Sequence, residues 1–234
     1  MGIVRYTLGF KYNSRFIYLI LYIMKKGGKI KANDLKQILQ GTYKDPKSNV
    51  GSYELDKGLS SDTVLVYVDK LKKEVKIAIR GTAPGIDWAN NLLYGIKSGL
   101  QKISPRYTKA KKIVDDARSK YAGYTFEFMG HSQGGIHARE LAKSNESVVT
   151  VNPGTRGEYT PNEQIIRSAG DAVSALGVLP SWFKNLTHGK DNKDITTSYK
   201  VNPLDAHKLD ILDELGDQVV GSGLRCSCCG DYIR

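Results

Sequence analysis

The sequence predicts an α/β fold built on a largely parallel sheet. Two β-branched runs, Thr63–Val68 and Val75–Ile79, flank a charged turn and predict a hairpin. Further strand-like segments follow at Tyr124–Met129, Val148–Val151, Ile165–Arg167 and Thr197–Val201. Helix-like segments separate several of these strands, and that alternation is typical of parallel strands joined by helical crossovers.

Two of the predicted helices lie between strands of this sheet. The stretch Tyr107–Tyr121 follows Pro105 and places its apolar residues at helical spacing. A second helix is predicted over Gly134–Lys143. Nearer the N-terminus, we expect a short helix over Leu35–Leu39, capped by Asn33 or Asp34.

A chain of 234 residues is long enough for one ample domain with a core that needs no disulfide or metal. We divide it into a basic and apolar segment over 1–45 that packs on the core, an α/β domain over 46–222 and a tail over 223–234. The longest apolar run covers 16–24 and is too short to cross a bilayer as a helix, which needs about 20 residues. A buried helix or strand is favoured over a signal peptide, because no small-residue cleavage site follows.

The formal net charge of +11 is unevenly distributed. Residues 1–122 hold 24 Lys and Arg against 10 Asp and Glu, whereas residues 123–234 hold 11 against 14. Lys provides most of the excess, and a Lys-rich surface suits loose attraction to phosphates better than the reading of bases. We therefore expect no nucleic-acid partner. The basic half either keeps the protein in solution or makes peripheral contact with an anionic membrane surface.

The three cysteines, Cys226, Cys228 and Cys229, all lie in the tail. This position excludes a disulfide-stabilised secreted fold and favours a reduced tail in an intracellular protein. Acylation, or a metal site shared with a partner chain, is the alternative, since three thiols do not complete a zinc site. The sequence has no phosphate-binding loop of the Walker type, and we expect neither a metal nor an organic cofactor.

The pentapeptide Gly130-His131-Ser132-Gln133-Gly134 lies between a predicted strand and a predicted helix. A serine in so tight a turn is held in strained geometry, and only glycines two residues to either side avoid a clash. The turn raises the hydroxyl above the sheet and directs N–H groups of the helix start at a developing oxyanion. Ser132 is therefore the candidate nucleophile.

Three blocks of sequence resemble the class 3 lipases, a branch of the α/β-hydrolases. They are Phe126–Gly135 around the serine, Ile77–Thr82 with its Arg-Gly-Thr ending, and Ile86–Leu92 with its Asp-Trp-x-x-Asn pattern. The resemblance covers roughly residues 60–215 and implies an α/β-hydrolase fold with a mostly parallel central sheet flanked by helices. Gln133 stands where the family usually has Leu. The short spacing between the candidate catalytic residues implies a reduced lid or pocket.

A serine nucleophile needs a base, and the base needs an acid that fixes its tautomer. In this architecture the chain order is Ser, acid, His. His207 follows the last predicted strand and is favoured over His188, whereas His131 and His137 precede any candidate acid and are interpreted as structural. Asp171 resembles the family's acid after a strand and is favoured over Asp191, Asp194 and Asp205.

The resemblance also implies an oxyanion hole. The backbone N–H of Gln133 and a group of Thr82 are its predicted donors. Ile86, Trp88, Leu92 and Leu93 form either an amphipathic lid over an acyl pocket or part of a fixed core helix, and the core helix is slightly favoured.

The sequence as a whole predicts a serine esterase or lipase that cleaves acyl esters of lipids through an acyl-enzyme. The alternatives are a catalytically weak hydrolase-fold protein on anionic membranes, or another serine hydrolase such as a thioesterase or peptidase. With no convincing signal peptide or transmembrane helix, we expect a cytoplasmic or peripheral membrane protein. In this interpretation the basic half docks the protein and the other half carries the chemistry.

Overall fold

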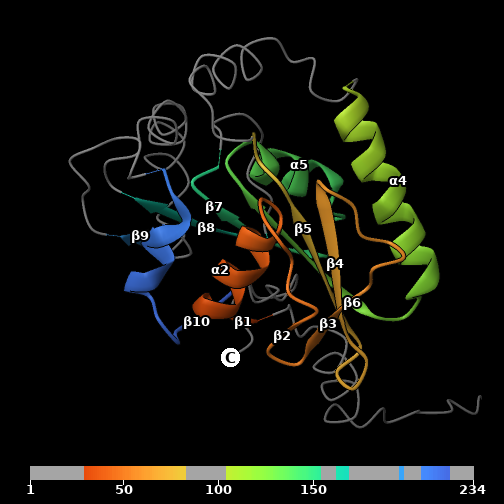
Figure 1. Ribbon diagram of the computed structural model, residues 1–234, viewed down its shortest axis with the longest axis horizontal. Helices are drawn as coiled ribbons and strands as arrows, with labels where there is room; N and C mark the ends of the chain where they lie inside the picture. The colour runs from red at the N-terminus through yellow and green to blue at the C-terminus, as the bar shows by residue number, and fades with distance from the viewer. Residues whose placement is uncertain (1–28, 83–103, 154–161, 169–194, 198–206, 222–234) are drawn as a thin grey trace, which may run out of the picture.

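The computed structural model describes residues 29–82, 104–153, 162–168, 195–197 and 207–221. Within these residues, an eight-stranded sheet has the order β2-β3-β4-β5-β6-β7-β8-β9 (Figure 1). The strands are β2 (Asn49–Val50), β3 (Tyr53–Leu55), β4 (Val64–Asp69), β5 (Glu74–Ile79), β6 (Thr125–His131), β7 (Ser147–Val151), β8 (Glu163–Ser168) and β9 (Ile195–Thr197).

The sheet is antiparallel from β2 to β5 and parallel from β5 to β9, so four of its seven pairings are parallel. The predicted hairpin is confirmed as β4 and β5, in which Val64 pairs with Ile79 and Asp69 with Glu74. The predicted α/β architecture, a mostly parallel sheet with helices on its faces, is also confirmed.

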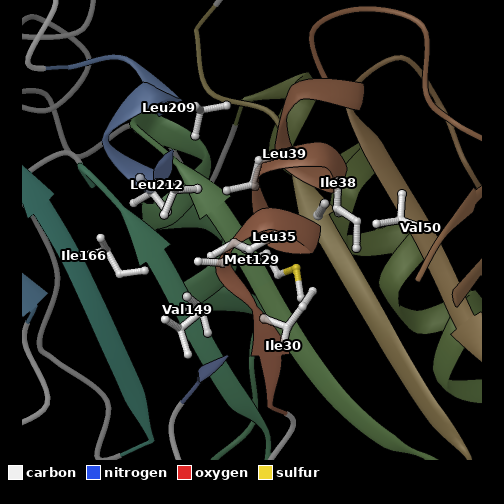
Figure 2. Packing of buried hydrophobic residues seen from close by; sticks show 14 of the residues in the cluster. Ile30, Leu35, Ile38, Leu39, Val50, Met129, Val149, Ile166, Leu209 and Leu212 are labelled. Carbon is white, nitrogen blue, oxygen red and sulfur yellow. The ribbon is translucent and has the colours of Figure 1, made fainter. Parts of the chain in front are cut away.

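Helices cover both faces of the sheet, and each face has its own core. On one face lie α4 (Pro105–Lys120) and α5 (Gln133–Leu141), packed on alternate residues of β4, β5 and β6. On the other face lie α2 (Ala32–Gly41) and the 3₁₀ helix η2 (Leu209–Glu214). Figure 2 shows Leu35 and Leu39 of α2 and Leu212 of η2 against Met129 and Val149 of the sheet.

The start of α2 differs from the sequence prediction. Neither Asn33 nor Asp34 caps the helix; the capping position is Lys31, which makes no side-chain capping hydrogen bond. The first N–H groups are instead satisfied by backbone, because Ala32 donates to the carbonyl of Gln218 and Asn33 to that of Gly216. β1 (Ile30–Lys31) also pairs antiparallel with β10 (Val219–Val220). A sequence reading of local caps cannot find a partner that lies almost two hundred residues away.

α4 corresponds to the helix predicted over Tyr107–Tyr121, but it begins two residues earlier, at the proline. Pro105 occupies the first turn, and the Ser104 side chain accepts a hydrogen bond from the Tyr107 N–H as the cap. None of the helices among the described residues combines the length and the apolar character that crossing a membrane requires. The division of the chain at residues 45 and 222 stays a prediction.

A charged pair is buried within the sheet. Lys76 on β5 and Glu127 on β6 are both almost fully buried, and Lys76 Nζ lies 2.7 Å from Glu127 Oε2. Glu74 adds a second carboxylate 3.6 Å from Lys76 Nζ. The same carboxylate accepts a hydrogen bond from the Tyr53 hydroxyl at 2.6 Å. Burial raises the pKa of Glu127, whereas the charge of Lys76 opposes that rise.

Lys76→Met should therefore destabilise the protein by about 3–5 kcal/mol, because it leaves the Glu127 carboxylate buried without a countercharge. Lys76→Met combined with Glu127→Leu should recover most of that loss. Urea unfolding of the three proteins measures the difference. Equal loss in the single and the double variant would contradict an interdependent pair.

Candidate active site

Ser132 lies in the tight turn between β6 and α5, as the sequence predicts. Its φ of 56° and ψ of −129° place a non-glycine residue at positive φ, which is a strained conformation. The backbone holds it there, because Ser132 N–H donates to the Val151 carbonyl and the Ser132 carbonyl accepts from Gly135. The side chain is 2% exposed, and its hydroxyl has no hydrogen-bond partner among the described residues.

Gly130 and Gly134 explain the spacing of the pentapeptide. A Cβ on Gly130 would lie 2.3 Å from the Gly134 carbonyl oxygen. A Cβ on Gly134 would lie 2.1 Å from the carbonyl oxygen of Ile79 on β5. Helix α5 therefore starts so close to β5 and β6 that no side chain fits at either position, and this closeness sets the turn at Ser132.

A buried ion pair fixes the rest of α5. Arg139 donates from Nε to Glu163 Oε2 at 2.6 Å and from Nη2 to Oε1 at 2.7 Å, and both side chains are buried. The Thr150 hydroxyl donates to the same carboxylate at 2.8 Å. Two parallel N–H···O contacts define an angle as well as a distance, so α5 is oriented over β7 and β8.

The two residues predicted to supply the oxyanion donors contact each other through their side chains. The Thr82 hydroxyl, just beyond β5, donates to Gln133 Oε1 at 2.9 Å. The glutamine that departs from the lipase pattern thus holds Thr82 against the start of α5. Gln133 is the first residue of α5, so its N–H is one of the groups that have no acceptor within the helix.

His207 lies next to this turn through its contact with His131. The rings of the two histidines lie 5.0 Å apart between centroids, and His207 is 4% exposed. The His207 carbonyl lies 2.7 Å from His131 Nε2. Because a carbonyl can only accept, Nε2 of His131 carries the proton, and His131 fixes the backbone of the predicted base.

Tyr43, which the sequence analysis missed, completes this chain of hydrogen bonds. Its hydroxyl accepts from the Gly81 N–H at 3.0 Å and lies 2.8 Å from His131 Nδ1. The Tyr43 hydroxyl therefore donates its one proton in a hydrogen bond to His131 Nδ1. The resulting series of hydrogen bonds runs from Gly81 through Tyr43 and His131 to the His207 carbonyl. Burial raises the pKa of the Tyr43 hydroxyl to about 12, so it stays protonated and able to donate. Tyr43 follows α2 in a segment whose sequence has no recognisable motif, and no local signal could have identified it.

Arg106 on α4 is a second residue that the sequence analysis missed. Its Nη2 donates to the Gly81 carbonyl at 2.6 Å and also to the Arg80 carbonyl. These contacts hold the backbone just before Thr82 from the α4 side, whereas Tyr43 holds Gly81 from the α2 side.

Asn152 holds the end of β7 against the end of β8 through hydrogen bonds. Asn152 follows β7 and has a φ of 42°. Its backbone N–H donates to the Ile166 carbonyl, and its side-chain oxygen accepts a hydrogen bond from the Ser168 N–H at 3.0 Å. Ser168 ends β8, and Asp171 comes three residues later in the sequence. Asn152 therefore fixes the point from which the chain continues towards the predicted acid.

Several predicted residues lie outside the described residues. They are Asp171 and its rivals Asp191, Asp194 and Asp205, His188, the lid or core segment with Ile86, Trp88, Leu92 and Leu93, the apolar run over 16–24 and the three tail cysteines. The structure thus brings together Thr82, Gly130, His131, Ser132, Gln133, Gly134 and His207. The roles of these residues stay predictions.

The predicted structural role of His137 is consistent with its surroundings. His137 on α5 is 1% exposed, its ring lies 5.5 Å from the Tyr107 ring, and neither ring nitrogen has a hydrogen-bond partner among the described residues. Burial, with a contribution from the charge of Arg106, lowers the pKa of His137 to about 4. His137 is therefore neutral in the folded protein at pH 7.

The mostly parallel sheet with helices on both faces and the strained serine between β6 and α5 define an α/β-hydrolase fold, the fold class that the sequence predicts. No family model and no curated protein matches the sequence. Similar solved structures include fungal lipases, the kind of protein that the sequence motifs resemble.

Three of these structures serve as examples. A triacylglycerol lipase from Penicillium expansum is 16% identical, with a TM-score of 0.46 over 71% of this chain and 78% of its own. The lipase–propeptide complex of Rhizomucor miehei is 15% identical, with a TM-score of 0.41 over 74% and 66%. Lipase II from Rhizopus niveus is 14% identical, with a TM-score of 0.41 over 74% and 78%. At these values the likeness assigns no activity, and the function has to follow from the site.

Tyr43→Phe should destabilise the protein by about 1–3 kcal/mol, because it leaves the Gly81 N–H and His131 Nδ1 without their partner. Tyr124→Phe is the matched control, since the Tyr124 side chain is half-buried and its hydroxyl makes no hydrogen bond among the described residues. The control should change stability by less than about 0.5 kcal/mol. Urea unfolding compares the two variants, and equal effects would contradict the role given to Tyr43.

His137 should make the protein less stable in acid. In the unfolded chain a histidine takes up its proton near pH 6.5, whereas folded His137 does so only near pH 4. The unfolded state therefore binds more protons between these values, and stability falls as the pH is lowered from about 6.5 to 4, by roughly 3 kcal/mol in total. Unfolding of wild type and His137→Phe across this range measures the contribution. An identical pH dependence in both proteins would show that His137 does not cause it.

Proposed function

We propose that the protein is a serine ester hydrolase, with Ser132 as its nucleophile. The observation that carries this proposal is the strained, buried Ser132 at the start of α5, with His207 fixed beside the same turn through His131. Strain of this kind persists only where the surrounding structure enforces it, and it clusters at functional sites. The buried serine hydroxyl, which has no partner among the described residues, is available to a base and a substrate.

In the proposed mechanism Ser132 Oγ attacks the ester carbonyl while His207 accepts its proton. Asp171 is proposed as the acid that orients His207. It lies outside the described residues, and its support is its place in the sequence three residues after β8. His207 then returns the proton to the leaving alcohol, which leaves an acyl group on Ser132. Water, deprotonated by His207, attacks this ester and releases the acid.

The oxyanion that forms in both steps would be stabilised by backbone N–H groups at the start of α5 and after β5. Gln133 N–H lies directly after the nucleophile, where the partial positive charge of the helix start adds to its effect. Thr82 is held at this place through its hydrogen bond to Gln133 and through the contacts of Arg106 and Tyr43 with Gly81. Preorganised donors of this kind lower the barrier because they need not reorient during the reaction.

The proposed substrates are lipid esters, on the strength of the motif resemblance to the class 3 lipases. A peripheral contact of the basic half with an anionic membrane stays a prediction of the sequence. The hydrolase proposal does not depend on it.

A fluorophosphonate probe, which phosphonylates activated serines, tests the proposed nucleophile directly. Wild-type protein should be labelled, and Ser132→Ala should lose both the label and the hydrolysis of a short-chain 4-nitrophenyl ester by about 10³-fold or more. Ser147→Ala is the matched control, because Ser147 on β7 is also 2% exposed, and it should keep the label. Thermal unfolding confirms that each variant is folded. Folded wild-type protein that takes up no label would overturn the proposal in favour of a binding protein with a hydrolase fold.

A further inference from the structure

Arg80 carries a positive charge that is not directly neutralised among the described residues. It follows β5, and its Nε is buried without a hydrogen-bond partner. Asp62 is close enough for the charge of Arg80 to lower its pKa, but its carboxylate is held by Lys109, at 2.7 Å. A buried Nε without a hydrogen-bond partner costs free energy, and an anion from outside that accepts from the guanidinium would offset that cost.

A second arginine increases the positive potential at this place. Arg106 lies near Arg80, and its own Nε is also buried without a partner among the described residues. Burial and the positive charge of Arg80 both lower the pKa of Arg106. The fold therefore holds two like charges together beside the backbone that leads to Thr82.

Arg80 opens into a cavity of about 490 Å³. Its lining includes the basic residues Lys44 and Lys57 and the acidic residues Asp45 and Asp62. Leu65 contributes apolar surface to the wall. Since Asp62 pairs with Lys109, the cationic groups of the lining exceed the free acidic ones. The cavity thus combines an apolar surface with cations, which suits a small amphiphilic anion.

The cavity adjoins the proposed reaction centre. Its wall includes Tyr43, whose hydroxyl binds both Gly81 and His131. Arg80 precedes Thr82 by two residues, a length of chain that spans at most about 7 Å. Arg80 and Tyr43 thus link the cavity to the backbone that leads to Thr82, whose hydroxyl contacts Gln133.

We propose that this cavity binds an anionic group, a phosphate or a carboxylate, carried by the ester that Ser132 cleaves, with Arg80 as the main contact. The guanidinium donates paired N–H groups that match the oxygens of either anion. The inference rests on the proposed hydrolase function and adds the substrate class, an acidic ester in preference to a neutral one.

The test compares kcat/KM for neutral 4-nitrophenyl butanoate with that for the anionic 4-nitrophenyl monoester of glutaric acid. Wild type should prefer the anionic ester. Arg80→Gln should reduce the ratio of anionic to neutral kcat/KM by about tenfold, and Arg80→Lys should restore part of it. Lys112→Gln removes one charge from the exposed surface of α4 and should leave the ratio unchanged. A wild-type preference for the neutral ester, or an unchanged ratio in Arg80→Gln, would overturn the inference.

A binding measurement tests the anion site independently of the proposed hydrolase activity. It also shows whether the site takes free phosphate or an anionic group of the substrate. Inorganic phosphate should raise the Tm of wild type by about 2 °C or more over chloride at equal ionic strength, and should have no such effect on Arg80→Gln. It should also compete with the glutarate ester more than with the butanoate ester.

Phosphate stabilisation without fluorophosphonate labelling would remove the hydrolase function but keep the anion site. Labelling with equal rates for both esters and no phosphate effect would remove the anion site alone. Phosphate stabilisation with equal ester rates would assign the site to free phosphate and overturn the substrate class.

Discussion

The closeness of α5 to the sheet is the constraint on which the rest of the site depends. With no room for a Cβ at Gly130 or Gly134, the chain must turn within two residues of β6. The turn forces Ser132 to positive φ and leaves the Gln133 N–H at the start of a helix. The buried pair of Arg139 and Glu163 then orients α5, so a charge interaction at the far end of the helix helps to fix the geometry of the serine.

The second half of the site is held by a polar chain and not by packing alone. Gly81, Tyr43, His131 and the His207 carbonyl are linked by hydrogen bonds of 3.0, 2.8 and 2.7 Å. This chain joins four segments that are far apart in the sequence: the end of α2, the end of β5, the serine turn and the loop before η2. Because each buried polar group in it has a partner, a shift of one segment costs hydrogen bonds in the others. His131 hydrogen-bonds at both of its ring nitrogens in this chain, and one of these bonds contacts the backbone of the proposed base, His207.

The sequence predicts the parts of the site that local chemistry determines. The pentapeptide around Ser132 is recognisable because the turn itself demands its glycines, and the Arg-Gly-Thr ending of β5 precedes the predicted oxyanion donor for a similarly local reason. Tyr43 and Arg106 were missed because their role comes from contacts across 38 and 25 residues with Gly81, which leave no pattern in the chain. The cap of α2 was misplaced for the same reason, since Gln218 and Gly216 supply its partners.

The charge distribution has a different meaning in three dimensions from the one that it has along the chain. Along the chain, the basic half appears separate from the half that holds Ser132 and His207. In the fold, Lys111 and Lys112 of α4 pair with Asp115 and Asp116 at the surface. Surface pairs of this kind contribute little to stability, and they do not change the net charge, because both partners are already counted in it. Arg80 and Arg106, in contrast, lie beside the backbone before Thr82 with buried Nε groups that have no partner among the described residues. Among the described residues, these two arginines of the basic half are therefore the cations that we propose to attract an anion near the site. The docking of the basic half on an anionic membrane stays a prediction, and these two arginines show that basic residues of that half also lie beside the backbone that leads to Thr82.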